Sequence, residues 1–462
     1  MLEQTTRAEY NFVCDFFSEL SIMFSDVSIM RALSRSWLLS LLCLFVATTA
    51  VGQSVDRRNV DEHTNLGIRY AEANELKEAE RHFAAAASLA PSDPSTRNNY
   101  GAILMRLGRT EQARAEFEAS LKLNPDQPSA LTNLAQIYFD RGQPDDLQMA
   151  RTLLQRATKN TSDTEISRAL VITCLKLGQV LMAKGDLRGA GRTLESAVAS
   201  GLDDARIYAA LAEVYEADGH YENAIPAMRL ALQRDPQNEA YHFRYGLLLT
   251  DSHAPAAGIL RLQEALKQFP SSARLWLALG IAQLTYGKNV EAEDSFKRSL
   301  ALDAKLLPAL AYLGVTYAER GLYEKAINFY EQAIALNGNL GALHYLVADT
   351  ILKTANADTT RSEKYLKRAT ELDPTLAAAY LAWARLYVRA DRYSEAAPLL
   401  ERAVSLQPEL LEAHYQLSRV LVKLKRPDEA NRELGIFKQL SEKQKAQNES
   451  REIVRRLANV RF

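Results

Sequence analysis

The chain has 462 residues with 56 basic and 57 acidic side chains, so its formal net charge is −1 at neutral pH. A hydrophobic fraction of 47% and a charged fraction of 24% are typical of a packed soluble protein and argue against a disordered chain. Residues 60–437 contain no block of basic residues, which argues against nucleic acid as a partner.

The N-terminal part contains the pattern of a secretory signal. Met30 is followed by Arg31 and Arg35, then by the mostly apolar run 37–47 and by small residues up to Gly52. The apolar run is shorter than the ~20 residues that span a bilayer. The pattern predicts a signal peptide over 30–52, cleaved near Gly52, with an uncleaved inner-membrane anchor as the alternative.

Residues 1–29 precede this signal, and we interpret Met30 as the true start, with a longer leader as the alternative. We therefore expect a periplasmic or secreted protein, or one held by an inner-membrane anchor with the rest of the chain outside the cytoplasm. Cys14 and Cys43 lie in the segment expected to be removed, which leaves Cys174 without an intramolecular partner.

From about residue 60 the sequence repeats with a period of 34 residues. Leu66, Gly67 and Tyr70 return as similar residues one period later, and many copies also carry alanines and a final proline, although the copy with Leu177 and Gly178 lacks the tyrosine and the proline. A period of this size indicates stacked supersecondary units that bury their apolar faces against each other. Corresponding positions in four further copies are Tyr100, Gly101, Leu104 and Pro125; Leu211, Ala212, Tyr215 and Pro236; Leu279, Gly280 and Ala292; and Leu313, Gly314 and Tyr317.

This pattern resembles the tetratricopeptide repeat, a helix-turn-helix unit, with about eleven copies over residues 60–437. The resemblance implies an all-α, right-handed superhelical solenoid. Small residues such as Gly101 and Gly178 are expected to let the two helices of a unit approach closely, and prolines such as Pro91 to end the second helix. A polar stretch over 158–167 suggests a break in the array.

The sequence offers no catalytic or metal-binding pattern that we recognise, and we expect neither an enzyme nor a cofactor. His63, His242, His344 and His414 occupy the position that is aromatic in other copies, such as Trp276. Because whole repeats separate them, we interpret these histidines as packing residues of the first helices and not as metal ligands.

In the family that this pattern resembles, first helices line a concave groove that binds a protein or peptide. At the groove positions the chain has an early zone of amides, a middle apolar zone and a late basic zone. The apolar zone is either groove floor or buried core. The predicted groove residues are Asn98, Asn99, Asn133 and Gln136 in the early zone; Phe243, Leu247, Leu277 and Ile281 in the middle zone; and Arg385, Arg389, Arg419 and the adjacent Tyr415 in the late zone.

Two interpretations of the late arginines remain open. Either they pair with acids such as Glu371, Glu395 and Glu412, which we favour, or they await an acidic partner. The lysine–asparagine clamp known from the family's peptide grooves is absent, because the matching positions hold residues of other kinds. These are Thr64 and Ile68 in the first copy, and Asn98 and Ala102 in the second.

The C-terminal segment 438–462 is polar at first and then amphipathic, which predicts a helix that caps the last repeat. Together, these features predict a non-catalytic exported scaffold or adaptor in envelope assembly. Its partner is a protein or peptide, and any membrane contact runs through an uncleaved signal. The alternative is an accessory component of a polysaccharide-synthesis or export machine.

Overall fold

The computed structural model describes residues 57–159, 161 and 163–458, with side chains described up to residue 444. Every regular element in this part of the chain is an α-helix. The chain divides into two compact units, one that ends at Leu202 and one that begins at Asp203, and within each unit successive helices pack against each other in chain order. The predicted signal 30–52 and the segment 1–29 lie outside the described residues.

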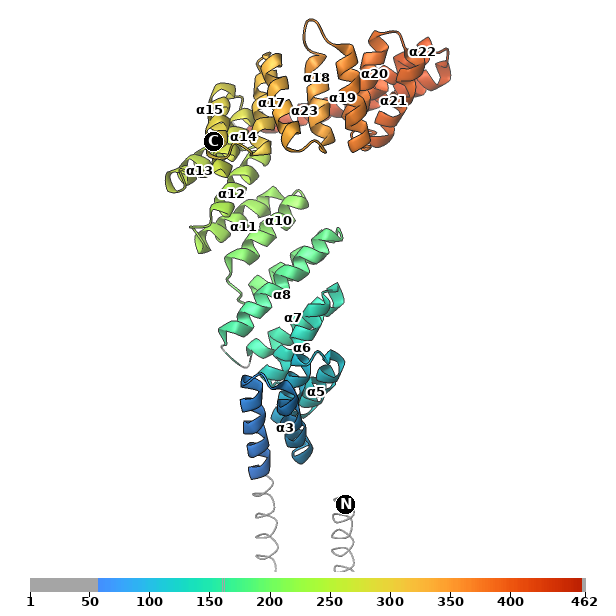
Figure 1. The fold of residues 1–462 in the computed structure, drawn as a ribbon. Helices are drawn as coiled ribbons and strands as arrows, with labels where there is room; N and C mark the ends of the chain where they lie inside the picture. The colour runs from blue at the N-terminus through green and yellow to red at the C-terminus, as the bar shows by residue number, and fades with distance from the viewer. Residues whose placement is uncertain (1–56, 160, 162, 459–462) are drawn as a thin grey trace, which may run out of the picture. The chain divides into compact units, whose positions relative to one another are not determined.

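Unit 1 begins with a helix that includes residues 57–72. Helices then alternate as first and second members of antiparallel pairs (Figure 1). They are α3 (Leu76–Leu89), α4 (Pro94–Arg106), α5 (Thr110–Leu123), α6 (Pro128–Arg141), α7 (Pro144–Lys159), α8 (Thr164–Ala183) and α9 (Leu187–Ala199).

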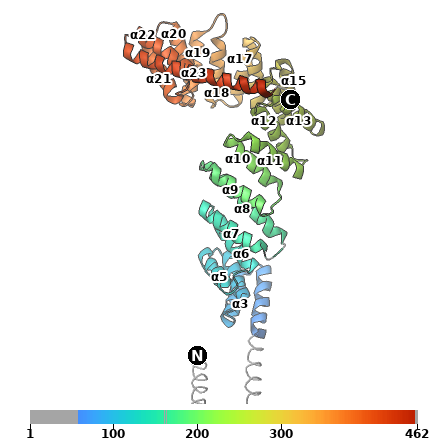
Figure 2. The same ribbon diagram turned by 180° about the vertical axis from the view of Figure 1, so that it is seen from behind.

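Unit 2 continues the alternation and ends in a long helix, which Figure 2 shows in red. Its helices are α10 (Ala205–Ala217), α11 (Tyr221–Arg234), α12 (Glu239–Asp251), α13 (Pro255–Gln268), α14 (Ala273–Thr285), α15 (Asn289–Leu302), α16 (Leu307–Glu319), α17 (Tyr323–Leu336), α18 (Gly341–Ile351), α19 (Thr359–Leu372), α20 (Ala377–Arg389), α21 (Tyr393–Leu406), α22 (Leu411–Lys423) and α23 (Pro427–Ala458).

Small residues set the distance between the two helices of a pair. A Cβ atom added to Gly101 in α4 would lie 2.7 Å from Cε1 of Phe117 in α5, so only glycine fits there. Gly280 and Gly314 face Phe296 and Tyr330 in the same way, at 2.5 Å. Four alanines of the second helices are 0% exposed, namely Ala79, Ala224, Ala326 and Ala396. The close approach expected from the sequence is therefore present in both units.

Prolines end the second helices as the sequence predicts. Six second helices stop two residues before a proline, because a proline disfavours helical conformation in the residue that precedes it. The prolines are Pro91, Pro125, Pro236, Pro270, Pro374 and Pro408. Within pairs, turn glycines such as Gly108 and Gly321 have positive φ angles of 77° and 73°, a conformation that costs glycine little.

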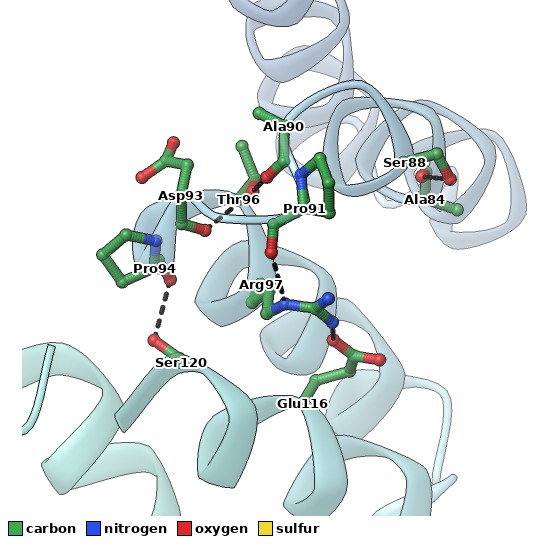
Figure 3. A network of polar contacts seen from close by, with 10 residues as sticks. All are labelled: Ala84, Ser88, Ala90, Pro91, Asp93, Pro94, Thr96, Arg97, Glu116 and Ser120. Carbon is green, nitrogen blue, oxygen red and sulfur yellow. Dashed lines mark hydrogen bonds and ion pairs between the residues drawn. The ribbon is translucent and has the colours of Figure 1, made fainter. Parts of the chain in front are cut away.

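The turn between α3 and α4 is held by side chains from α4 and α5 (Figure 3). Thr96 donates a hydrogen bond to the carbonyl oxygen of Ala90, and Arg97 donates from Nε to that of Pro91 at 3.0 Å. Arg97 also forms an ion pair with Glu116 in α5, and Ser120 donates to the carbonyl oxygen of Pro94. The carbonyl group of Pro91 lies between the two helices, so the bond from Arg97 satisfies an acceptor that neither helix satisfies.

First helices form an inner layer in each unit. Besides its own pair, α4 contacts α6, and in unit 2 α12 contacts α14, α14 contacts α16, α18 contacts α20 and α20 contacts α22. No comparable contact joins successive second helices in the described part of the chain. The first helices therefore crowd together on the inside of the stack. We call the exposed surface of the first helices α10, α12, α14, α16, α18, α20 and α22 the inner face of unit 2.

Two segments differ from the sequence expectation. The polar stretch expected over 158–167 is short, because α7 extends to Lys159 and α8 starts at Thr164, capped by the Asp163 side chain. At the C-terminus, residues 438–458 do not form a separate capping helix; they continue α23, which begins at Pro427. A polar segment with good helix formers has no signal that would end a helix near residue 438.

Helix α8 is unusual in length and composition. Among the described residues it alone is long and apolar enough to cross a membrane, and 39% of its apolar stretch is buried. It packs between α7 and α9 and contributes Leu170, Val171 and Leu177 to the buried residues of unit 1. Core helices of soluble proteins share these properties.

Candidate functional site

A pocket of about 720 Å³ opens on the inner face of unit 2. Residues from α10, α12, α14 and the turn between α11 and α12 line it. The lining residues are Glu216, Asp235, Gln237, Asn238, Glu239, Ala240, Phe243, Arg244, Leu247, Asp251 and Arg274.

The floor of this pocket is apolar and rigidly supported. Phe243 and Leu247 lie one turn apart on α12, and both pack on a buried cluster from α13 and α14 that includes Leu262 and Leu279. Both side chains remain partly exposed toward the pocket. They can therefore bury apolar atoms of a ligand without rearrangement of the core.

The charged groups of the pocket differ in how they are held. Arg244 forms ion pairs with Glu213 at 2.5 Å and with Glu216 at 3.1 Å, which fixes its guanidinium group across α10 and α12. Ser272 donates a hydrogen bond to Glu239 at 2.6 Å. Asn238 donates one to Asp235 at 3.1 Å.

Two charged side chains of the pocket have no such restraint. Asp251 and Arg274 make no hydrogen bond or ion pair with their side chains inside the described part of the chain. Both are exposed overall, yet partial burial at the pocket raises the pKa of the Asp251 carboxyl group above its ordinary value. These two groups are free to pair with a ligand.

The predicted early zone lies in unit 1 and is largely occupied by internal hydrogen bonds. Asn98 is only 7% exposed and accepts a hydrogen bond from Asn133 at 3.1 Å. Asn99 is half-buried. Gln136 is exposed, donates to Asp140 at 2.7 Å and lines a smaller pocket of about 150 Å³. The structure therefore corrects the prediction for Asn98, which is a packing residue and offers little surface to a partner.

The predicted middle zone divides between pocket and core. Phe243 lines the pocket, whereas Leu277 is 5% exposed and belongs to a buried cluster with Phe296 and Leu313. Ile281 packs against that same cluster. For Leu277 the structure thus agrees with buried core, the second of the two alternatives, because this residue packs against the following pair of helices.

In the predicted late zone, Arg389 and Arg419 lie on the surface. Arg385 forms an ion pair with Glu412 at 3.4 Å. Arg389 and Arg419 are exposed and form no ion pair with the residues that the structure describes; Arg419 lies over the ring of Tyr415 at 5.7 Å. Tyr415 in turn contacts Phe437 of α23, with ring centroids 5.3 Å apart.

Of the three acids considered as partners for these arginines, only Glu412 takes that role. Glu371 pairs with Arg368 at 3.3 Å, and Glu395 pairs with Arg392. Internal pairing therefore accounts for Arg385 but for neither Arg389 nor Arg419.

The four histidines in the aromatic position pack in the first helices, and each also forms a hydrogen bond; that of His63 joins its Nδ1 to Nδ1 of His82 at 2.9 Å. His242, His344 and His414 each form a hydrogen bond from Nε2 to the carbonyl oxygen six residues earlier, at 2.9–3.0 Å. Trp276 does the same through Nε1 at 3.1 Å. In the part of the chain that the structure describes, no group of three or more His, Cys, Asp or Glu side chains is arranged to hold a metal ion.

Sequence reasoning missed the charged residues of the pocket. Glu216, Asp235, Asp251 and Arg274 come from different helices and turns, and only the packing of α10, α12 and α14 brings them to one site. The turn that follows α12 has no glycine, and His253 adopts a positive φ of 63° there.

Models of the tetratricopeptide repeat match the chain in several places. One model matches residues 175–239 and 246–306, two others match 388–436 and 308–340, and a model described as TPR repeat matches 101–142. A human protein, the antiviral innate immune response effector IFIT1, is 23% identical, with a match that covers 38% of this chain and 43% of that protein. The match thus spans less than half of the human relative.

Several solved structures are similar to the chain. Tom70 from yeast is 16% identical with a TM-score of 0.46, over 87% of this chain and 97% of that structure. PilF from Pseudomonas aeruginosa is 21% identical with a TM-score of 0.38, over 47% and 96%. MamA from Desulfovibrio magneticus RS-1 is 20% identical with a TM-score of 0.34, over 37% and 96%. No function of this chain follows from these likenesses.

Proposed function

The chain belongs to the tetratricopeptide-repeat proteins, and on this premise we propose that it is a non-catalytic scaffold that binds an extended segment of a protein partner. The segment lies on the inner face of unit 2 and is anchored in the pocket built by α10, α12 and α14. Repeat arrays of this kind present long surfaces that suit such partners.

The pocket is the observation that carries this proposal. Its volume of about 720 Å³ exceeds that of a single large side chain, and it lies on the surface where first helices of successive pairs meet. The turn before α12 presents the side-chain amides of Gln237 and Asn238, which can hydrogen-bond a peptide backbone next to the apolar floor.

The chemistry of the lining supports binding and not catalysis. Carboxylates, guanidinium groups, amides and apolar side chains line the pocket, and the set contains no serine, cysteine or histidine that a neighbouring base could activate. Phe243 is the single aromatic residue among them, and sugar-binding sites generally stack their ligands on several aromatic rings. This favours a peptide over the polysaccharide alternative.

We extend the proposal to the cellular setting. The basic start, short apolar run and small residues over 30–52 support export through a signal that is cleaved near Gly52, or retention by an inner-membrane anchor. About eleven repeats then act outside the cytoplasm, as an adaptor in envelope assembly. Cys174, buried and unpaired, is compatible with either side of the membrane.

Selection from a random peptide display library on the purified protein tests the binding function. The selected peptides are then titrated against the Ala240→Trp variant, whose new side chain fills the pocket mouth from an exposed position. Ala301→Trp is the matched control, since Ala301 is an exposed alanine on the second helix α15. We expect Ala240→Trp to weaken binding by about tenfold or more and Ala301→Trp to leave it unchanged.

Two results would contradict the proposal. One is that no peptide is enriched, in which case a glycan array on the same protein tests the polysaccharide alternative. The other is that peptides are enriched but bind both tryptophan variants equally well, which would place the binding surface outside the pocket.

A further inference from the structure

We propose that the pocket on the inner face of unit 2 selects a basic side chain, lysine or arginine, of the bound segment. This inference rests on the proposed function and adds the chemical class of the anchoring residue. Its evidence is the charge of the lining, the shape of the pocket and the free carboxylate of Asp251.

The lining is acidic in excess. Four carboxylates and two guanidinium groups line the pocket, so its formal charge is −2. The acids are Glu216, Asp235, Glu239 and Asp251, and the bases are Arg244 and Arg274. Arg244 is neutralised by its two ion pairs with Glu213 and Glu216. The remaining carboxylates of Asp235, Glu239 and Asp251 therefore face only one unpaired cation, that of Arg274.

The partners of these carboxylates leave capacity for a ligand. Glu239 accepts one hydrogen bond from Ser272, and Asp235 accepts one from Asn238, whereas a carboxylate can accept several. The side chain of Asp251 accepts none from the described residues. A cationic donor would satisfy these oxygen atoms with charge-assisted hydrogen bonds, which are stronger than those between neutral groups.

The arrangement suits an organic cation on a long stem better than a metal ion. The carboxylates do not converge, because the described residues contain no cluster of three or more ligands able to hold a metal. Phe243 and Leu247 supply an apolar floor between the charged groups. Lysine and arginine match both features, since their aliphatic stems bury on apolar surface while the charged head reaches polar groups.

The pocket and the C-terminal part of the inner face differ in the sign of their charge. Arg389 and Arg419, in α20 and α22, are exposed without an ion pair in the described residues, so that surface attracts anions. A basic side chain of the bound segment is therefore attracted to the pocket and repelled by the surface of α20 and α22. The polarity predicts one orientation for a segment that carries a basic residue at one end and acidic residues at the other.

The probe is a random twelve-residue peptide display library, selected in parallel on three proteins. They are the unaltered chain, the double variant Asp251→Asn with Glu239→Gln, and the control variant Glu409→Gln. Glu409 is an exposed acid in the turn between α21 and α22 that lies outside the pocket and forms no ion pair with the residues the structure describes. All substitutions are isosteric and lie on partly or fully exposed side chains, and circular dichroism confirms that each protein is folded.

We expect lysine and arginine to be enriched in peptides selected on the unaltered chain and on Glu409→Gln, and the enrichment to disappear on the double variant. In a selected peptide, replacement of its enriched lysine by norleucine should weaken binding by about tenfold, because it keeps the stem and removes the charge. Binding of the lysine peptide should also weaken as salt rises.

The outcomes separate this inference from the function on which it rests. Enrichment of peptides without a basic preference, or with an acidic one, would overturn the inference and leave the peptide-binding function standing. A basic preference that persists in the double variant would also overturn it, since another surface would then read the charge. Failure to enrich any peptide would contradict both.

Discussion

Replacement of Gly101 by alanine should destabilise unit 1, whereas the same replacement at Gly178 should not. Both glycines lie inside first helices of unit 1 and face the second helix of their own pair. An added Cβ at Gly101 would lie 2.7 Å from Cε1 and 2.9 Å from Cδ1 of Phe117. At Gly178 the nearest atom is Cδ1 of Leu194, at 3.4 Å.

The magnitudes follow from two opposing effects. Alanine in a helix interior is favoured over glycine by about 1 kcal/mol. At Gly101 the ring of Phe117, which is 0% exposed, would have to shift by about 1 Å in a packed core, at a cost of about 1–3 kcal/mol. The net expectation is a loss of up to about 2 kcal/mol for Gly101→Ala. Leu194 can adjust a flexible chain end, so Gly178→Ala should gain about 0.5–1 kcal/mol.

Urea unfolding of the two variants, followed by far-UV circular dichroism and by tyrosine fluorescence, measures the difference. Two signals are needed because a repeat array does not always unfold in one step. The reasoning would be refuted if the two variants changed the free energy of unfolding equally. It would also be refuted if Gly101→Ala proved more stable than the unaltered chain.

Three further predictions concern single side chains. Burial raises the pKa of the Cys174 thiol to about 11, against a smaller opposing effect of Arg151, so little thiolate exists at pH 8. A thiol reagent should therefore label the native protein about two orders of magnitude more slowly than the urea-unfolded protein, and equal rates would show an accessible thiolate. Trp276→Phe removes the hydrogen bond from Nε1 to the carbonyl oxygen of Pro270, so it should lower the free energy of unfolding by about 1 kcal/mol, measured by thermal denaturation. An unchanged free energy of unfolding would show that water fully replaces this bond. A Cβ atom added at Gly435 in α23 would have no atom within 4 Å, so Gly435→Ala should raise the free energy of unfolding by about 1 kcal/mol. A lower free energy of unfolding would instead indicate a contact on that face of the helix.

The 34-residue period predicted most of the fold because each signal in it has a local physical cause. Pro91 and its equivalents end helices by their own geometry, and Gly108 and its equivalents adopt positive φ at turns. Gly101 and Gly280 mark the close approach of two helices that are neighbours in sequence. Such features need no knowledge of contacts between distant parts of the chain.

The pocket could not be predicted in the same way, because its composition depends on contacts between successive pairs. Phe243 and Leu277 occupy equivalent positions of consecutive copies, yet one lines the pocket and the other is buried against the next pair. Likewise, Asp251 and Arg274 have no sequence feature that relates them until α12 and α14 lie side by side.

Hydrogen–deuterium exchange of the full chain, with and without a peptide selected on it, tests the central claim most directly. If a protein segment binds on the inner face of unit 2, the amides of α12 (Glu239–Asp251) and of the turn at 235–238 should exchange more slowly when the peptide is present. The amides of the second helix α15 should not change. Protection confined to second helices, or to unit 1, would contradict the account.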